Sequence, residues 1–337
     1  MAVTDHAGLS PEQVQFFEDN GYLLIPDALS QDTVAELLSE SQKMLREFPI
    51  ESHPMTKFST GQGSEQEHVG DDYFLESGDK IRFFFEEGST PPFSPSPPPS
   101  LTHHPLPDAF DPTGALTKPK ERAINKIGHY LHQLSPPFRA VSLSPRNAAI
   151  ARALGFADPR ILQSMVICKQ PEIGGAVPPH QDSPFLYTNP PSAVGFWYAL
   201  EDCTRSNGCL SFAPGSHKMS PVASRFVRMK EAGKGEKGTG FVKNAGARYP
   251  PAIQRERESG GVEGDETGIE SEVGYVMGEV KAGTLVLIHG NVLHKSERNL
   301  SEKSRFIYTF HCIEGRNEYD RLNWLQPPKE GFSRLNG

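Results

Sequence analysis

A histidine and an aspartate two positions apart, His180 and Asp182, are the residues of this sequence that point most directly to chemistry. They follow a short extended run. In extended backbone, residues i and i+2 point to the same side, so both side chains can reach one metal ion. The segment 285–294 (LVLIHGNVLH) offers a third ligand, either His289 or His294. Two imidazoles and one carboxylate on one face of an octahedron leave three positions open, which is typical of oxygen-activating non-haem iron(II).

Arg305 strengthens this interpretation, because a histidine and an aspartate at this spacing also occur together in solvated turns. It stands eleven residues beyond His294, on an extended run. A guanidinium there can bind a carboxylate through two parallel hydrogen bonds. A dicarboxylate co-substrate needs such an anchor, and its 2-oxo acid end can occupy two of the open metal positions. One position then remains for dioxygen.

The elements that must position these residues are short extended runs separated by turn residues, at 162–170, 195–201, 209–213, 283–289 and 305–313. This rhythm is typical of a sandwich or barrel. The 30 prolines and 31 glycines also suit many short strands joined by turns better than a helical protein. We therefore predict a mainly β protein with flanking helices, forming one domain over 1–337 with its core at 161–315.

The first 160 residues are predicted to form a helical flank. Ser10 is expected to cap a helix over 11–19, and Ser30 to begin an amphipathic helix that ends near residue 48. Residues 21–26 and 79–86 read as extended. Two further helices are expected, over 123–134 and over 146–154.

Two segments have few apolar residues and are predicted to lie outside the core. Residues 90–112 are crowded with proline and serine, which indicates a surface loop or a disordered segment. Residues 229–272 are rich in Gly, Lys and Glu, so we expect a long insertion that buries little surface.

Composition excludes several classes of protein. The formal net charge is −8 and the basic residues are scattered, so a nucleic-acid partner is not expected. No stretch approaches the roughly 20 apolar residues of a membrane span, and residues 1–10 do not resemble a secretory leader. The four cysteines form no metal-binding or disulfide pattern. We expect a cytoplasmic protein that acts on a small molecule; the sequence does not predict its oligomeric state.

The segment 207–217 (NGCLSFAPGSH) resembles the N-G-x-L-x-x-x-P-G-S-H motif of the phytanoyl-CoA dioxygenase family. The resemblance covers most of the chain and includes further runs in the same order: GDKIRFFFE at 78–86, INKIGH at 124–129, KQP at 169–171, FLYT at 185–188, LVLIHG at 285–290 and NWLQP at 323–327. It implies a double-stranded β-helix, a cupin-like jelly-roll barrel with iron at its mouth.

The resemblance also implies site residues. It favours His294 over His289 as the third ligand, because Ser296 and Arg305 then stand at the family's offsets. His217 would close a turn. The implied iron(II) ligands are His180, Asp182 and His294. The residues implied to bind the co-substrate, 2-oxoglutarate, are Arg305, Ser296, Lys126, Met165 and Trp197.

The implied reaction uses iron(II), 2-oxoglutarate and dioxygen to hydroxylate a small molecule, with release of succinate and carbon dioxide. The carboxylate of Asp182 favours oxygenation, since related halogenases have a small residue at this position. Two alternatives stay open. One is a zinc or manganese hydrolase or isomerase in which Arg305 binds an anionic substrate. The other is a non-catalytic protein that senses 2-oxoglutarate or serves as an interaction module.

Overall fold

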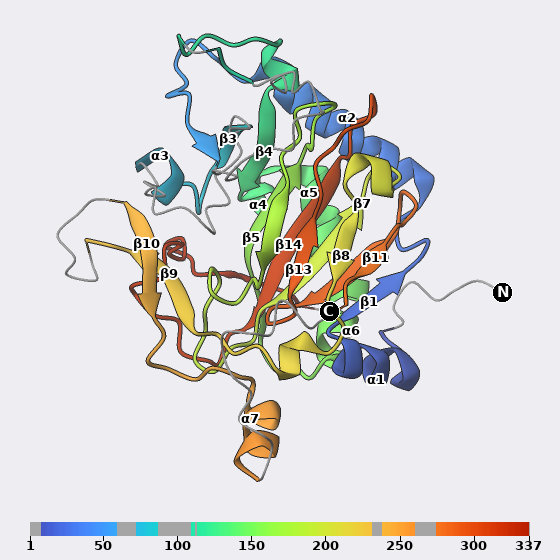
Figure 1. Ribbon diagram of the computed structural model, residues 1–337, viewed down its shortest axis with the longest axis vertical. Coiled ribbons are helices and arrows are strands. Elements are labelled where there is room, and N and C mark those ends of the chain that lie inside the picture. The colour runs from blue at the N-terminus through green and yellow to red at the C-terminus, as the bar shows by residue number, and fades with distance from the viewer. Residues whose placement is uncertain are drawn as a thin grey trace, which may run out of the picture.

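The computed structural model describes residues 8–58, 72–86, 109–111, 113–230, 238–259 and 274–336. Two sheets form the body of the protein (Figure 1). The larger has the strand order β1-β12-β7-β14-β5-β4-β3-β2, with β15 added beside β5, and the smaller has the order β11-β8-β13-β6. Their strands are β1 Tyr22–Ile25, β2 Lys57–Phe58, β3 Ile81–Glu86, β4 Ile124–His129, β5 Pro159–Ile167, β6 Val177–His180, β7 Val194–Ala199, β8 Leu210–Phe212, β11 Val276–Gly278, β12 Leu285–His289, β13 His294–Ser296, β14 Ile307–Glu314 and β15 Ser333–Arg334.

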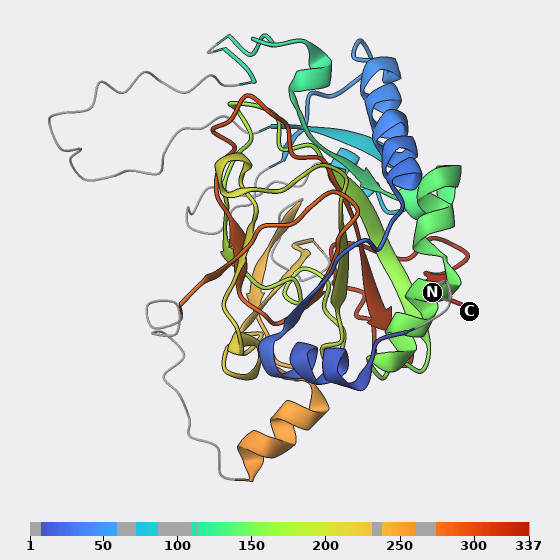
Figure 2. The same ribbon diagram turned by 90° about the vertical axis from the view of Figure 1, so that its right-hand side faces the viewer.

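Strand alternation gives the larger sheet two different faces. Its inner face packs on the smaller sheet, where Trp197, Val286 and Ile307 join Phe212 in one apolar cluster. Its outer face joins the helices in the main core. The described α-helices are α1 Pro11–Asn20, α2 Gln31–Glu47, α3 Asp72–Leu75, α4 Leu131–Leu134, α5 Pro136–Ser142, α6 Pro145–Ala153 and α7 Pro251–Glu258. Figure 2 shows α2 in blue and α5 and α6 in green on the outer side of the sheet, whereas α7 in orange lies below the barrel. The predicted jelly-roll fold is confirmed.

The starts of the first two long helices were readable from the sequence. Ser10 and Gln13 form a reciprocal capping box at the start of α1, and Gly21 ends that helix with φ +79°. The hydroxyl of Ser30 accepts a hydrogen bond from the backbone N–H of Thr33 at the start of α2. Helix α6 likewise matches the helix expected over 146–154.

The helix predicted over 123–134 is wrong for its first half. Residues Ile124–His129 form strand β4, between β3 and β5, and only α4 is helical. The register shifts opposite Phe84 and Phe85, which leaves Asn125 as an extra residue. Ile124 and Ile127 therefore both reach the outer core although they are three residues apart. The β-bulge thus gives a strand a spacing of apolar residues that is also typical of a helix.

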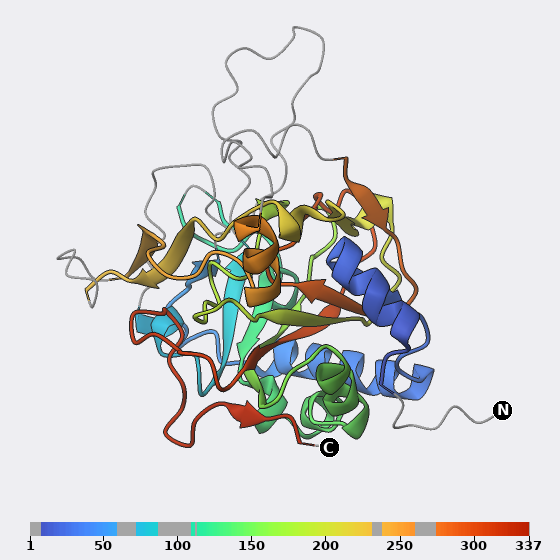
Figure 3. The ribbon, with the colours of Figure 1, turned by 90° about the horizontal axis from the view of Figure 1, so that it is seen from below.

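The insertion predicted over 229–272 contains ordered structure in the part that is described. Strand β10, Thr239–Lys243, pairs with β9, Ser224–Arg228. The ring of Phe241 packs on Phe185 and Phe226, with centroids 5.5 and 5.2 Å away. Figure 3 shows this hairpin on the side of the barrel opposite α1. Within β10 only Thr239 is buried and Phe241 is 38% exposed, so the described part of the insertion forms an ordered strand yet buries few side chains. Residues 231–237 and 260–273, and almost all of the Pro-rich segment 90–112, lie outside the described residues.

Candidate active site and metal centre

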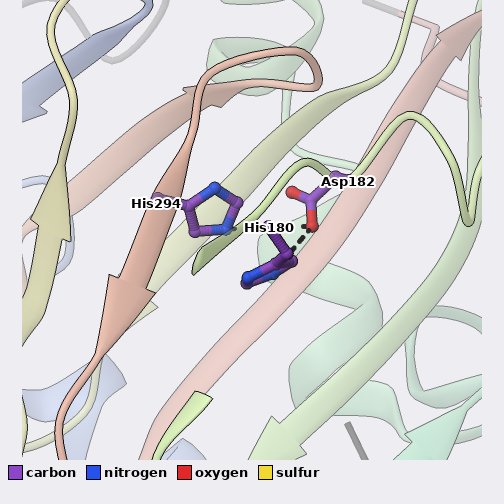
Figure 4. A group of neighbouring side chains, drawn as sticks. All are labelled: His180, Asp182 and His294. Atoms are coloured by element: carbon purple, nitrogen blue, oxygen red, sulfur yellow. Dashed lines mark ion pairs between the residues drawn. The ribbon is translucent and has the colours of Figure 1, made fainter. Parts of the chain in front are cut away.

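The three predicted metal ligands meet at the end of the smaller sheet (Figure 4). His180 ends β6 and His294 begins β13, and these two residues are directly paired across the antiparallel strands. Asp182 follows two residues later. One oxygen of its carboxylate lies 3.6 Å from Nε2 of His180 and 3.8 Å from Nε2 of His294. One potential ligand atom from each residue lies within 4.8 Å of the other two.

Hydrogen bonds to the backbone fix how both imidazoles face this point. Nδ1 of His180 lies 3.0 Å from the carbonyl oxygen of Pro178, and Nδ1 of His294 lies 3.1 Å from that of Val292. A carbonyl only accepts, so Nδ1 carries the proton in each ring and Nε2 keeps its lone pair for a metal. Burial, and then the neighbouring His180, lowers the pKa of His294 to about 4. The donor set of two nitrogens and one carboxylate fits iron(II).

His311 binds the same carboxylate from the opposite sheet. It lies on β14, and its Nε2 is 3.1 Å from the second oxygen of Asp182. Gly195 faces it from β7, where an added Cβ would come within 3.3 Å of that nitrogen. Burial raises the pKa of Asp182, but His294 and His311 outweigh this effect and hold the pKa well below its usual range. Such a contact orients the carboxylate, a role that the sequence had not indicated.

Arg305 lies deep in the barrel just before β14. Its side chain is only 2% exposed, Nη1 donates to the carbonyl of Gly208 at 2.8 Å, and the guanidinium carbon is 5.7 Å from the ring centroid of Trp197. Nε is buried without a hydrogen-bond partner. Burial lowers the pKa of this guanidinium. Within the described ranges, no carboxylate forms an ion pair with Arg305. This buried positive charge could therefore bind an anion.

Three of the remaining predicted pocket residues, Trp197, Met165 and Lys126, share the inner face of the larger sheet, and Ser296 lies on the smaller sheet. Trp197 and Met165 both pair with Thr309 of β14, from β7 and β5 respectively. Lys126 lies on β4 two residues before the glycine that pairs with Met165, so its side chain points to the same face. It is buried, with Nζ 5.4 Å from the ring centroid of Phe84, and burial holds its pKa well below the usual value. Ser296 follows His294 by two residues on β13.

The two competing histidines lie elsewhere. Nδ1 of His289 accepts a hydrogen bond from the backbone N–H of Asn291, and its ring faces Phe17 and His217. Nε2 of His217 contacts the carbonyl oxygen of Glu18. Neither histidine belongs to the three-residue cluster. The structure thus brings together the set that contains His294, and metal binding by that set remains a prediction.

Solved structures with the same architecture belong to several enzymes. The chain matches the non-heme α-ketoglutarate-dependent carbocyclase SnoK from nogalamycin biosynthesis with a TM-score of 0.55 at 18% identity, over 95% of this chain and 89% of that one. It matches EctD from S. alaskensis with bound Fe with a TM-score of 0.54 at 19% identity, over 97% and 84%. At these identities the likeness shows the fold alone. Fold and donor set together are those of a jelly-roll protein with a candidate metal site.

Sequence relatives then give the family. The profile of the family "Phytanoyl-CoA dioxygenase (PhyH)" matches residues 99–307. The "Phytanoyl-CoA dioxygenase domain-containing protein 1" of Bos taurus is 41% identical, over 96% of this chain and 97% of its own length. A "Phytanoyl-CoA dioxygenase" of Arabidopsis thaliana is 37% identical, over 95% of each. The chain belongs to the phytanoyl-CoA dioxygenase family. The predicted class, a non-haem iron(II) and 2-oxoglutarate-dependent oxygenase, is thereby confirmed, with iron, 2-oxoglutarate and dioxygen as its cofactor and co-substrates.

None of the helices in the described ranges is long and apolar enough to cross a bilayer.

Proposed function

We propose that this protein hydroxylates a small-molecule substrate, with conversion of 2-oxoglutarate to succinate and carbon dioxide. His180, Asp182 and His294 would hold the iron, which supplies the redox chemistry that activates dioxygen. Arg305 and Ser296 would bind the distal carboxylate of 2-oxoglutarate. Lys126, Met165 and Trp197 would line the same pocket.

The observation that carries this proposal is the buried charge of Arg305 inside the barrel that also holds the triad. An isolated charge in a protein interior costs several kcal/mol unless it is paired. The carbonyl of Gly208 satisfies one N–H group, yet no carboxylate neutralises the guanidinium in the described part of the chain. A bound dicarboxylate would supply the missing partner. A hydrolase that used only the metal would have no need of this cation.

The substrate itself would approach the triad from the side of Phe185. The ring of Phe185 is 6.4 Å from that of His180 and packs against Phe226 and Phe241 of the β9–β10 hairpin. An aromatic wall beside the metal suits an organic substrate with an apolar part.

The test combines co-substrate turnover with a search for product. Purified protein with iron(II), 2-oxoglutarate and oxygen is incubated with a metabolite extract, and succinate and products heavier by one oxygen atom are measured by mass spectrometry. Asp182→Ala serves as the inactive control. We expect succinate and at least one oxygenated product with the wild type only. Absence of 2-oxoglutarate binding together with zinc- or manganese-dependent hydrolysis would overturn the proposal.

A further inference from the structure

Lys169 is a second buried cation next to Arg305. It follows β5, its side chain is 2% exposed, and its backbone carbonyl accepts a hydrogen bond from the backbone N–H of Arg305 at 3.2 Å. Burial first, and then the positive charge of Arg305, holds the pKa of Lys169 well below its usual range. Among the residues that the structure describes, no carboxylate is within ion-pair distance of Lys169. Two adjacent basic side chains thus share one part of the interior, and a bound anion would favour the charged form of both.

The ammonium of Lys169 makes direct contact with the predicted co-substrate site. Nζ donates to Oγ of Ser296 at 3.0 Å and also to the carbonyl oxygen of Glu297. An ammonium has three donors and no acceptor, so Oγ of Ser296 must accept. The hydroxyl hydrogen of Ser296 is then directed away from Lys169. It can be donated to a ligand carboxylate.

Gly208 makes room for this arrangement. Its φ of +78° is a left-handed conformation that favours glycine, and its carbonyl oxygen accepts from Arg305. A Cβ at this position would lie 3.0 Å from Nζ of Lys169 and would collide with the carbonyl oxygen of Glu297. The absence of a side chain at Gly208 therefore lets Arg305 and Lys169 both approach the chain just before β8.

We propose that Lys169 is a positioning residue and the second cation of the dicarboxylate site, acting through Ser296 so that the pocket selects a 2-oxo dicarboxylate over a 2-oxo monocarboxylate. This inference rests on the proposed function. A distal carboxylate between Arg305 and Ser296 relieves the repulsion between the two cations, whereas a methyl group leaves both unpaired. A monocarboxylate would leave two buried positive charges without a partner, so the pocket binds it less tightly than a dicarboxylate.

The experiment compares two ligands that share the 2-oxo acid end. 2-Oxoglutarate and 2-oxobutyrate, which lacks the distal carboxylate, are titrated anaerobically into the iron(II) protein while the absorbance of the metal chelate is followed. The variants are Lys169→Met, which removes charge and hydrogen bonds, and Lys169→Gln, which keeps donors but loses the charge. Lys303→Gln is the matched control, because it removes an exposed cation two residues before Arg305. Thermal unfolding without ligand confirms that each variant is folded.

Lys169→Met is expected to raise the Kd of 2-oxoglutarate at least tenfold and that of 2-oxobutyrate less than threefold. Lys169→Gln should have an intermediate effect on 2-oxoglutarate. In a Ser296→Ala background, Lys169→Met should cost much less affinity, because contacting residues are not additive.

Three results would overturn the inference: equal losses for both ligands, wild-type affinity in whichever Lys169 variants are folded, or full additivity with Ser296→Ala. If wild-type protein failed to bind 2-oxoglutarate, the proposed function would fail as well. If Arg305→Gln lost binding and the Lys169 variants did not, only the role of Lys169 would fail.

Discussion

Replacing Arg305 with glutamine tests whether the pocket binds a dicarboxylate. Glutamine keeps a polar amide donor at this position, but it is shorter than arginine and cannot be assumed to replace the contact of Nη1 with the carbonyl of Gly208. The charge and the two-pronged geometry are lost. Truncating one partner of a buried, charge-assisted pair costs on the order of 2 to 5 kcal/mol, or roughly 30-fold to several thousand-fold in affinity at 1.4 kcal/mol per factor of ten. We expect the upper half of that range, since the guanidinium is 2% exposed and solvent screens it little.

The stability of the ligand-free protein should not fall as the affinity does, because Arg305→Gln removes a buried charge that has no anionic partner in the described ranges. Its thermal midpoint should stay equal or rise, while the stabilisation by added 2-oxoglutarate should disappear. Anaerobic titration of the iron(II) protein measures the affinity, with Lys303→Gln as control. Iron binding itself should not change. A 2-oxoglutarate affinity within threefold of the wild type would refute the anchor and favour the hydrolase alternative.

Three further predictions concern the histidines. His294→Ala should abolish iron-dependent succinate formation, whereas His289→Asn, which keeps an acceptor for the N–H of Asn291, should retain it; an inactive His289→Asn with an active His294→Ala would reverse the assignment of the third ligand. His311→Phe should weaken iron affinity about 10- to 100-fold by freeing the carboxylate it orients, measured by competition with a chelator; unchanged affinity would contradict that role. Burial lowers the pKa of His132 to about 3, whereas its ordinary value in the unfolded chain is 6.5. Below pH 6.5 the unfolded chain therefore binds more protons, and the free energy of unfolding should fall towards pH 3 by about 1.4 kcal/mol per pH unit from this residue. Acid titration should show this fall, and His132→Phe should flatten the curve.

Local spacing predicted the parts of the site that depend on neighbouring residues. His180 and Asp182 share a side because the backbone is extended there, and the structure shows both beside His294. The pairing of His294 with His180 could not be read from spacing, since it depends on two strands more than one hundred residues apart. Resemblance to a family supplied that choice. Physical reasoning from the residues alone had left His289 open.

The residues that sequence reasoning missed are those whose role depends on tertiary contacts. Lys169 follows a strand, where a lysine is usually solvated. Its ammonium group is instead satisfied inside the protein by Ser296 at the end of β13 and by the carbonyl of Glu297, the next residue. His311 could have been noticed, because it alternates with Ile307 and Thr309 and so points to the inner face of the barrel. Its contact with Asp182 nevertheless depends on the facing sheet.

The inner face of the barrel is divided between two tasks. Arg305 and Lys169 lie where we propose that the distal carboxylate of 2-oxoglutarate binds, and a side chain at Gly208 would collide with the carbonyl oxygen of Glu297. On the other side of the triad, Phe185 and Phe241 are held by a hairpin that contributes no metal ligand. Because Phe241 is 38% exposed, a different residue there would disturb the core little. Under the proposed function, we therefore expect substitutions in this hairpin to alter substrate selection without altering the use of 2-oxoglutarate.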